Sequence, residues 1–345
     1  MGTIKKSKML VAALLVGGVL AGCGSDASKG DSKSKDDKIE IRIGLDSGVQ
    51  HPAHKALLDF EKSVEEKSDG RIDIKLFPAS QLGTVMDMME QTRRGDIEMA
   101  FGASTLFSQT IPEFAVWDSF YLFDDAEHAH KVLDGDAGKL IMEQLESKGL
   151  TGLGYMEMGF RNFSNSKRPI ESLEDLKGLK IRGYSPIQIK GWESLGVSLT
   201  NLAWPEVFTS LQQNLIDGQE SATTSFYEAK FFEAQKYWSL TNHIYTDFLW
   251  YGNQKFMDSL TDEDRKLIED EAKVAIEQER AMIEEEEKAT LTLLKDSGVE
   301  INEVSLEERR RMGEIMNEAV KQDIIDKTGQ ELYDKVMDQV EAERK

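Results

Sequence analysis

The fold class follows from residues 39–101, IEIRIGLDSGVQHPAHKALLDFEKSVEEKSDGRIDIKLFPASQLGTVMDMMEQTRRGDIEMAF. Residues 39–45 alternate apolar and polar side chains, which is the period of a strand, and residues 72–77 do the same. Between them, residues 53–67 carry apolar side chains at helical spacing, and a glycine follows. The segment therefore opens with a strand, a helix and a second strand.

The same order continues along the chain and later recurs. The further predicted elements are a helix over 85–94, a strand over 97–101, a strand over 150–158, a short helix after a capping box at Ser172, a strand over 179–182 and a helix from Trp204. Strands that alternate with helices predict an α/β fold. The roughly 300 residues that carry this pattern exceed what one core usually supports, so we expect two similar lobes.

A long helix is predicted from Thr261 to Ser297, because this stretch contains neither Pro nor Gly and Asp264 completes a capping box. Apolar residues recur every seven positions at Ile268, Ala275, Met282 and Ala289, and residues 284–287 are expected on the solvated side. At about 50 Å the helix is long enough to run along both lobes. A coiled-coil dimer is the alternative, although two alanines make its seam weak.

The N-terminus has the pattern of a secretion signal. Three lysines precede an apolar run over residues 9–20, about half the length that spans a bilayer. The run ends in LAGC at residues 20–23, which looks like the lipobox of bacterial lipoproteins, and Cys23 is the only cysteine of the chain. We therefore expect a signal peptide over 1–22, a lipidated Cys23 and a flexible tether over 23–38.

The net charge and the absence of certain motifs restrict the functions that the chain can have. The formal net charge is −21, which repels polyanions, so we do not expect the protein to bind nucleic acid. Nucleophile-elbow, zinc-protease and phosphate-loop motifs are absent from the sequence, so we do not expect an enzyme. No second apolar run is long enough to span a membrane, and the expected anchor is N-terminal.

Several motifs resemble the periplasmic solute-binding component of tripartite ATP-independent (TRAP) transporters, the DctP-like family of dicarboxylate- and sialic-acid-binding receptors. The resemblance extends from Ile39 to about Leu332. Its motifs, in the order of that family, are FPASQLG (77–83), EHAHKVL (127–133), GFRN (159–162), DLKGLKIR (175–182), LQQ (211–213) and DGQE (217–220).

The resemblance implies a two-lobed α/β receptor of the periplasmic-binding-protein type II fold, with a long helix across both lobes. The implied segments are lobe I over 39–158 and 247–286, lobe II over 159–246 and 287–315, and C-terminal helices over 316–345. It implies capture of a small organic carboxylate between the lobes and delivery to TRAP membrane subunits. We expect the receptor in the periplasm or at the outer face of the cytoplasmic membrane. We expect a monomer without a cofactor. Which carboxylate is bound is left open.

Four ligand-binding residues are implied in lobe II. Arg182 aligns with the carboxylate-binding arginine of the family, and a guanidinium matches a carboxylate bidentately and stays charged when buried. Arg161 aligns with a second cleft arginine, the alternative being an exposed loop arginine. Trp204 stands where the family has a large aromatic, the alternative being a core tryptophan. Ser221 replaces the usual Asn, which indicates altered specificity.

In lobe I, Asp46, His51 and Ala103 lie where the family varies with its substrate, and we treat them as candidate ligand contacts. Glu206 is expected to cap a helix rather than to bind ligand. Two alternatives remain open. One is a metal-binding receptor that uses the histidine pairs at 51 and 54 and at 128 and 130. The other is a sensor-coupled lipoprotein with no direct role in transport.

Overall fold

A nine-stranded sheet runs through residues 38–344, the part of the chain that this computed structural model describes. Its strand order is β2-β1-β3-β8-β4-β7-β5-β6, and β9 pairs with β8 off this path. The strands are β1 (Ile39–Gly44), β2 (Ile72–Phe77), β3 (Met99–Ala103), β4 (Leu150–Asn165), β5 (Lys180–Gly183), β6 (Ser198–Asn201), β7 (Gly218–Ala222), β8 (Tyr237–Asn253) and β9 (Glu300–Glu303).

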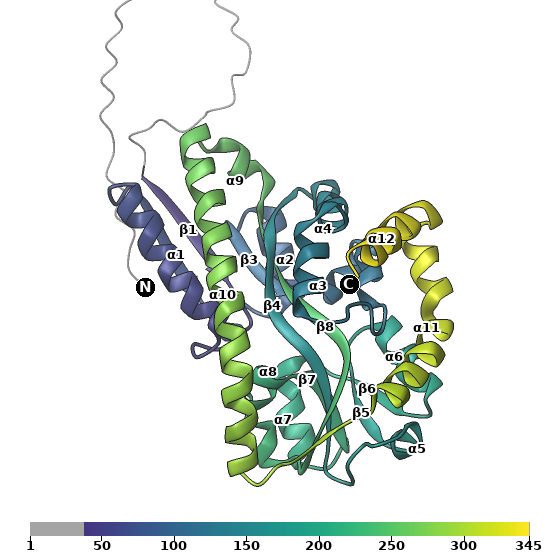
Figure 1. Cartoon of the computed structure of the whole chain (residues 1–345). Helices are drawn as coiled ribbons and strands as arrows, with labels where there is room; N and C mark the ends of the chain where they lie inside the picture. Colours follow the sequence, from purple (N-terminus) through teal and green to yellow (C-terminus); the bar gives the residue numbers. More distant parts are fainter. Residues whose placement is uncertain (1–37, 345) are drawn as a thin grey trace, which may run out of the picture. The chain divides into compact units, whose positions relative to one another are not determined.

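Helices cover the sheet on its outside, and the predicted α/β class is confirmed (Figure 1). The α-helices are α1 (Pro52–Lys67), α2 (Val85–Arg94), α3 (Ala126–Asp134), α4 (Asp136–Met142), α5 (Leu173–Leu176), α6 (Pro186–Ser194), α7 (Trp204–Gln212), α8 (Thr223–Glu228), α9 (Gln254–Ser259), α10 (Asp262–Asp296), α11 (Leu306–Thr328) and α12 (Gln330–Ala342). The 3₁₀ helices are η1 (Ser104–Gln109), η2 (Pro112–Asp118), η3 (Glu143–Lys148) and η4 (Phe231–Glu233).

Two boundaries differ from the sequence prediction. β3 begins at Met99 rather than at Ile97, because Gly95 caps α2 with φ 82° and the residues after it form the turn. β4 was expected to end at Met158 but continues to Asn165. The second half of β4 is buried on both faces, so it shows no alternation of apolar and polar side chains.

The long strands β4 and β8 join the two halves of the sheet. β8 pairs with β3 through residues 248–252, and β4 pairs with β7 through residues 161–165. The β4–β8 ladder is irregular between Glu157 and Gly159, where a bulge increases the local twist. The predicted lobe boundaries in β4 and β8 fall at this irregularity. The division into lobe I, lobe II and C-terminal helices itself stays a prediction.

Helix α10 runs beside both halves of the sheet (Figure 1). Thr261 caps it by accepting the backbone N–H of Asp264, as predicted. Its buried positions are Asp264, Ile268, Glu271, Ala272, Ala275, Ile276, Glu279, Ile283, Thr290 and Leu294. The prediction that every seventh residue is buried is therefore confirmed at Ile268 and Ala275 but is wrong at Ala289, which is exposed. Because a straight helix repeats every 3.6 residues, its buried face drifts away from a strict heptad.

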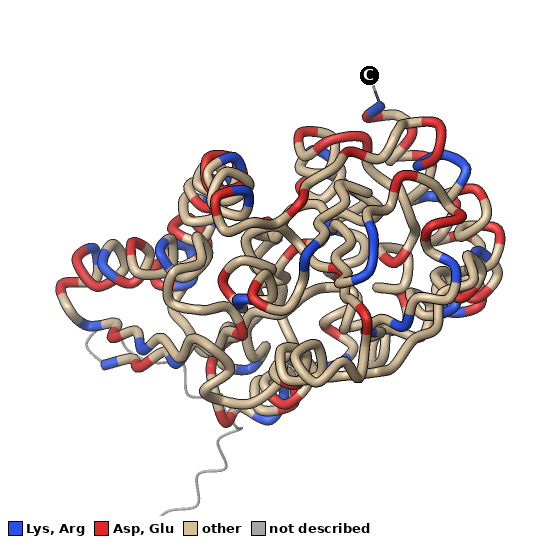
Figure 2. The backbone as a smooth tube through the Cα atoms, turned by 90° about the horizontal axis from the view of Figure 1, so that it is seen from below, with Lys and Arg blue, Asp and Glu red and all other residues tan. Residues whose placement is uncertain are grey.

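Charged residues of both signs are interspersed over the outer helices (Figure 2). Acidic residues were expected on the solvated side of α10 at 284–287, and Glu284 and Glu285 are exposed. Glu286 instead forms an ion pair of 3.1 Å with Lys55 of α1. Within residues 38–344, no helix is both long and apolar enough to cross a bilayer.

Glu279 joins α10 to the middle of β4. Its carboxylate is fully buried, and its Oε2 accepts the backbone N–H of Glu157 at 2.8 Å. Burial raises the pKa of Glu279 well above its usual value, while the neighbouring Arg280 opposes the shift. Arg280 itself donates to both carboxylate oxygens of Asp134 and to the carbonyl oxygen of Tyr155. A carboxyl group is thus buried at the contact between α10 and the joining strand.

Replacing Glu279 by Gln should make the stability of the fold less dependent on pH. The folded protein retains a proton on Glu279 that the unfolded chain loses above the ordinary pKa of 4.5, so the wild-type stability falls as pH rises past that value. We expect the Tm of Glu279→Gln, relative to wild type, to be higher at about pH 8 than at about pH 5, measured by calorimetry. Glu277→Gln, an exposed position of the same helix, is the matched control. An equal difference at both pH values would contradict the prediction.

Candidate functional site

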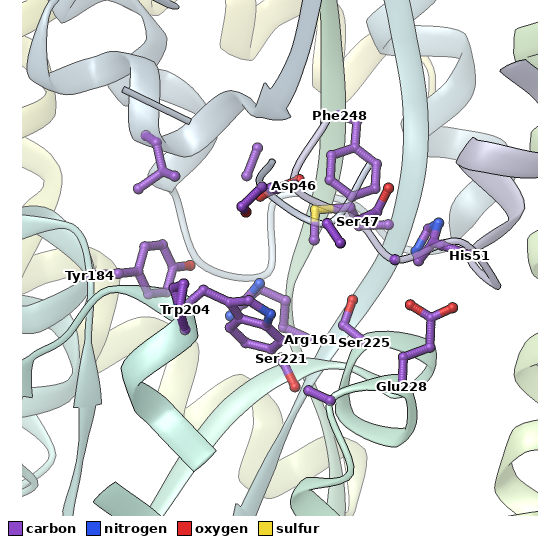
Figure 3. Close-up of a pocket in the computed structure, with 18 of the residues that line it drawn as sticks. Asp46, Ser47, His51, Arg161, Tyr184, Trp204, Ser221, Ser225, Glu228 and Phe248 are labelled. Carbon is purple, nitrogen blue, oxygen red and sulfur yellow. The ribbon is translucent and has the colours of Figure 1, made fainter. Parts of the chain in front are cut away.

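A cavity of about 330 Å³ opens between the two halves of the sheet (Figure 3). One wall comes from the turn after β1, the turn after β2 and the end of β3. The opposite wall comes from the end of β5, the start of α7 and the β7–α8 segment. All seven residues that the sequence proposed for ligand binding line it: Asp46, His51, Ala103, Arg161, Arg182, Trp204 and Ser221. The fold brings them together from positions far apart in the chain.

Arg182 lies at the end of β5 and is 7% exposed. Its Nε donates to the carbonyl oxygen of Leu202 at 3.0 Å. Its guanidinium carbon lies 4.8 Å from the ring centroid of Tyr184 and 5.3 Å from that of Trp204. Burial and the positive charge of Arg161 lower the pKa of Arg182 to about 10, so it remains charged at neutral pH. Within residues 38–344, no carboxylate forms an ion pair with it.

Arg161 lies in β4 and is buried, so the alternative of an exposed loop arginine is wrong. Its Nε and Nη2 donate to the two carboxylate oxygens of Glu220 in β7, at 2.5 and 2.9 Å, and Nη2 also donates to the backbone carbonyl of Glu220. His243 in β8 bonds to the same carboxylate at 2.9 Å. Burial alone would raise the pKa of Glu220, but Arg161 and His243 hold it below its usual range. The charge of Arg161 is therefore neutralised inside the protein.

Trp204 and Ser221 complete this wall. The Trp204 ring lies 4.8 Å from that of Phe231 and also covers Arg182, so it packs on the core and faces the cavity at once. Ser221 is 1% exposed, and its hydroxyl has no partner within the described residues. Glu206 accepts the backbone N–H of Ala203 at 3.0 Å, which confirms that it caps α7.

His51 and Asp46 face the cavity from the other wall (Figure 3). The Nδ1 of His51 accepts the backbone N–H of Ala53 at 3.1 Å, which places the ring proton on Nε2. Burial, assisted by Lys55, lowers the pKa of His51 to about 3, so the ring is neutral. Burial raises the pKa of Asp46 to about 6, against the opposing charge of Arg182. Ala103 ends β3 and exposes only a methyl group to the cavity.

Comparison with known proteins agrees with this geometry. Residues 46–327 match the family described as DctP, bacterial extracellular solute-binding protein, family 7. The chain belongs to this family.

Three similar proteins bind organic acids. The 2,3-diketo-L-gulonate-binding periplasmic protein of Escherichia coli is 34% identical over 76% of this chain and 80% of its own. The sugar acid binding protein of Advenella mimigardefordensis, solved with galactonate, is 31% identical with a TM-score of 0.85, covering 89% of this chain and 99% of its own. A TRAP periplasmic solute binding protein of Desulfovibrio salexigens, solved with orotic acid, is 28% identical with a TM-score of 0.85. The match covers 89% of this chain and 100% of that protein's chain.

Membership confirms that the chain is an extracytoplasmic solute-binding protein of the TRAP type, as the motifs indicated. It also confirms the two-lobed type II fold, because the solved relatives superpose over nearly their whole length. The family is one of binding proteins rather than of enzymes.

Some cavity residues of this family member were not predicted from the sequence. Glu228, Ser47, Thr105 and Ser225 line the cavity, and Figure 3 shows Glu228 across from His51. Glu228 ends α8, the helix that directly follows β7. A strand end followed at once by a helix is a typical place for cleft-facing residues. That signal could have drawn attention to the segment, although the acidic side chain resembles many others in the chain.

His128 and His130, one of the two histidine pairs that suggested a metal site, have structural partners. His128 bonds to the carbonyl oxygen of Val340 at 2.8 Å and accepts the backbone N–H of Asp124. His130 bonds to Glu157 at 2.9 Å. Among residues 38–344, no three His, Cys, Asp or Glu side chains are grouped so that they could hold a metal ion.

Removing Arg161 should destabilise the fold as well as change the cavity. Arg161→Leu leaves the Glu220 carboxylate buried without its cation, which costs about 3–5 kcal/mol. The double variant Arg161→Leu/Glu220→Leu should lose less unfolding free energy than the two single variants lose together, because no unpaired charge is then left buried. Urea unfolding measures each value.

The matched control is Arg311→Leu, which removes an exposed ion pair with Glu174 and should change the stability little. Additive single and double effects at Arg161 and Glu220 would show that the pair does not act as a unit.

Proposed function

We propose that this receptor holds the carboxylate of its ligand on Arg182 and passes the ligand to the membrane subunits of a TRAP transporter. The observation that carries the proposal is a buried guanidinium, facing a cavity, that has no carboxylate partner within residues 38–344. An uncompensated buried charge costs several kcal/mol, so the cavity is prepared for an anion. The three relatives described above bind carboxylates, which supports the same assignment.

The surroundings of Arg182 support a fixed geometry for this contact. One donor is occupied by the carbonyl of Leu202, and the rings of Tyr184 and Trp204 restrict the plane of the guanidinium. The remaining N–H groups suit the two oxygens of a carboxylate. A guanidinium held in advance loses little freedom when the ligand arrives. We assign Arg161 a secondary role, since its charge already has a partner in Glu220.

The cavity walls support capture by closure. Opposing walls come from the two halves of the sheet, which β4, β8 and α10 join. We propose that the predicted lobes approach each other on the ligand by a hinge at the irregular part of β4. Closing would remove water from the ion pair between ligand and Arg182, which strengthens it.

We further propose that the mature receptor is tethered to the membrane by lipid on Cys23 and acts as a monomer. Cys23, the signal peptide and the predicted tether lie outside the described residues, apart from Lys38. The support is the LAGC motif after a short apolar run, together with the absence of any second cysteine.

Replacing Arg182 should abolish ligand binding. Arg182→Leu removes the cation of the cavity wall that has no carboxylate partner among residues 38–344. Affinity should fall by at least about 100-fold, because such a loss corresponds to roughly 3–5 kcal/mol. Arg182→Lys should also bind weakly, since an ammonium cannot reproduce the planar fork. Isothermal titration calorimetry with the ligand that co-purifies, or with the best binder of a carboxylate library, measures both.

Arg311→Leu, far from the cavity wall and exposed, is the control and should bind as wild type does. Unchanged affinity in both Arg182 variants would refute the proposed carboxylate contact.

Replacing Cys23 by Ala should separate the receptor from the membrane. Without the thiol no lipid can be attached, so we expect the protein in the medium, or as an unprocessed precursor. Fractionation with labelled fatty acid distinguishes these outcomes from wild type. A Cys23→Ala protein that still incorporates label would disprove the anchor.

A further inference from the structure

The charges that line the cavity match one anionic group and no more. Four of the lining residues are acidic or basic at neutral pH: Asp46, Arg161, Arg182 and Glu228. Arg161 is neutralised by Glu220, and the imidazole of His51 is neutral. Arg182 is therefore the one cation in the described lining that is available to a ligand.

The same lining carries many polar atoms that lack partners. Seven lining residues have a buried oxygen or nitrogen with no hydrogen-bond partner among residues 38–344: Asp46 (Oδ1), Ser47 (Oγ), His51 (Nε2), Thr105 (Oγ1), Tyr184 (Oη), Ser221 (Oγ) and Glu228 (Oε1). Buried polar groups nearly always have a partner, from protein, water or ligand. Of these residues, His51, Thr105 and Ser221 are each 1% exposed, so bulk water does not serve them. The cavity thus offers hydrogen bonds around its whole wall.

Glu228 places a carboxyl group on the cavity wall that faces His51 (Figure 3). A Cβ added to Gly48 would lie 3.6 Å from its Oε2, so Glu228 reaches the opposite wall. Burial and the charge of Glu286 raise the pKa of Glu228 to about 8, while Lys55 opposes the shift. Such a group can donate or accept a hydrogen bond near neutral pH. A hydroxyl is a suitable partner, because it too can do both.

We propose that the cavity selects a polyhydroxylated monocarboxylic acid, a sugar acid, over a dicarboxylate, with Glu228 as the residue that binds the hydroxyls and determines this specificity. The proposal rests on the proposed function of Arg182. A second carboxylate would be buried without a cation and beside Asp46 or Glu228, which is costly. An unsubstituted fatty acid would leave these seven polar atoms without partners, which is also costly.

The cavity size agrees with this class of ligand. At about 330 Å³ it is near the lower end of the range of roughly 300–1,000 Å³ that is usual for small-molecule sites. A six-carbon acid with a hydroxyl on most carbons can reach from Arg182 toward the opposite wall. Its hydroxyls can then form hydrogen bonds with polar atoms on both walls.

Calorimetry on the purified protein tests the class directly. The probes are a panel of six-carbon aldonates and uronates, with succinate, hexanoate and glucitol. Succinate carries a second carboxylate, hexanoate lacks hydroxyls and glucitol lacks the acid. We expect the best sugar acid to bind at least about 100-fold more tightly than any of the three. Succinate binding as tightly as the best sugar acid, or a panel with no member that exceeds hexanoate, would overturn the proposal.

Variants of Glu228 test the residue. Glu228→Leu should weaken the best sugar acid by about tenfold or more, because it leaves hydroxyls unpaired, and should leave hexanoate unchanged. Glu228→Gln keeps the shape and most of the hydrogen-bonding capacity of the side chain, so it should lose less affinity for the sugar acid than Glu228→Leu does. Glu233→Leu and Glu233→Gln, at an exposed position soon after in the chain, are matched controls that should bind as wild type does. Thermal unfolding confirms that each variant is folded.

The two proposals can fail separately. If Arg182→Leu loses every acid while Glu228→Leu changes sugar acids and hexanoate alike, the carboxylate contact stands and the hydroxyl specificity is wrong. If the Arg182 variants keep full affinity for sugar acids, the proposed function itself fails.

Discussion

Two buried guanidiniums contact the same Tyr184 ring, and in the described part of the chain only one of them, Arg161, has a carboxylate partner. Glu220 neutralises Arg161 and also bonds to His243. The charge of Arg161 is therefore already compensated without a ligand. Arg182 has one carbonyl and two aromatic faces around it. The cost of keeping this cation buried is offset when an anion enters, and that imbalance gives the cavity its preference.

The strand order explains why Arg161 is paired with a carboxylate and Arg182 lies at the cavity. β7 lies between β4 and β5, so the register that pairs Phe163 with Glu220 places the acidic side chain near Arg161. The same strand pairs with β5 only at Ile181 and Gly218, next to Arg182. β5 is short, and Arg182 and Gly183 end it at the cavity. One arginine is thus held inside the ladder, while the other is left at the strand end where a ligand can reach it.

The two halves of the molecule contribute different chemistry to the cavity. The half that contains β5 and β7 supplies both arginines, Tyr184 and Trp204, whereas the half that contains β1 supplies Asp46, Ser47, His51 and Phe248. Neither half alone surrounds a ligand. In the proposed closure, ligand binding and lobe movement are linked, because a ligand gains its full set of contacts only when both walls are present.

Much of the fold was determined by the sequence itself. The strands β1 and β2, the helices α1 and α2 and the caps at Ser172 and Thr261 follow from periodicity and from local hydrogen bonds. The ordered motifs also indicated the family and, through the resemblance, seven of the residues that line the cavity. These features depend on neighbours in the chain, or on a pattern that the family shares. Only the tertiary structure decided that Glu220 neutralises Arg161, that Glu228 faces the cavity and that Ala289 of α10 is exposed. Arg161 and Glu220 are 59 residues apart, and their pairing depends on strand register and burial, which no local pattern records.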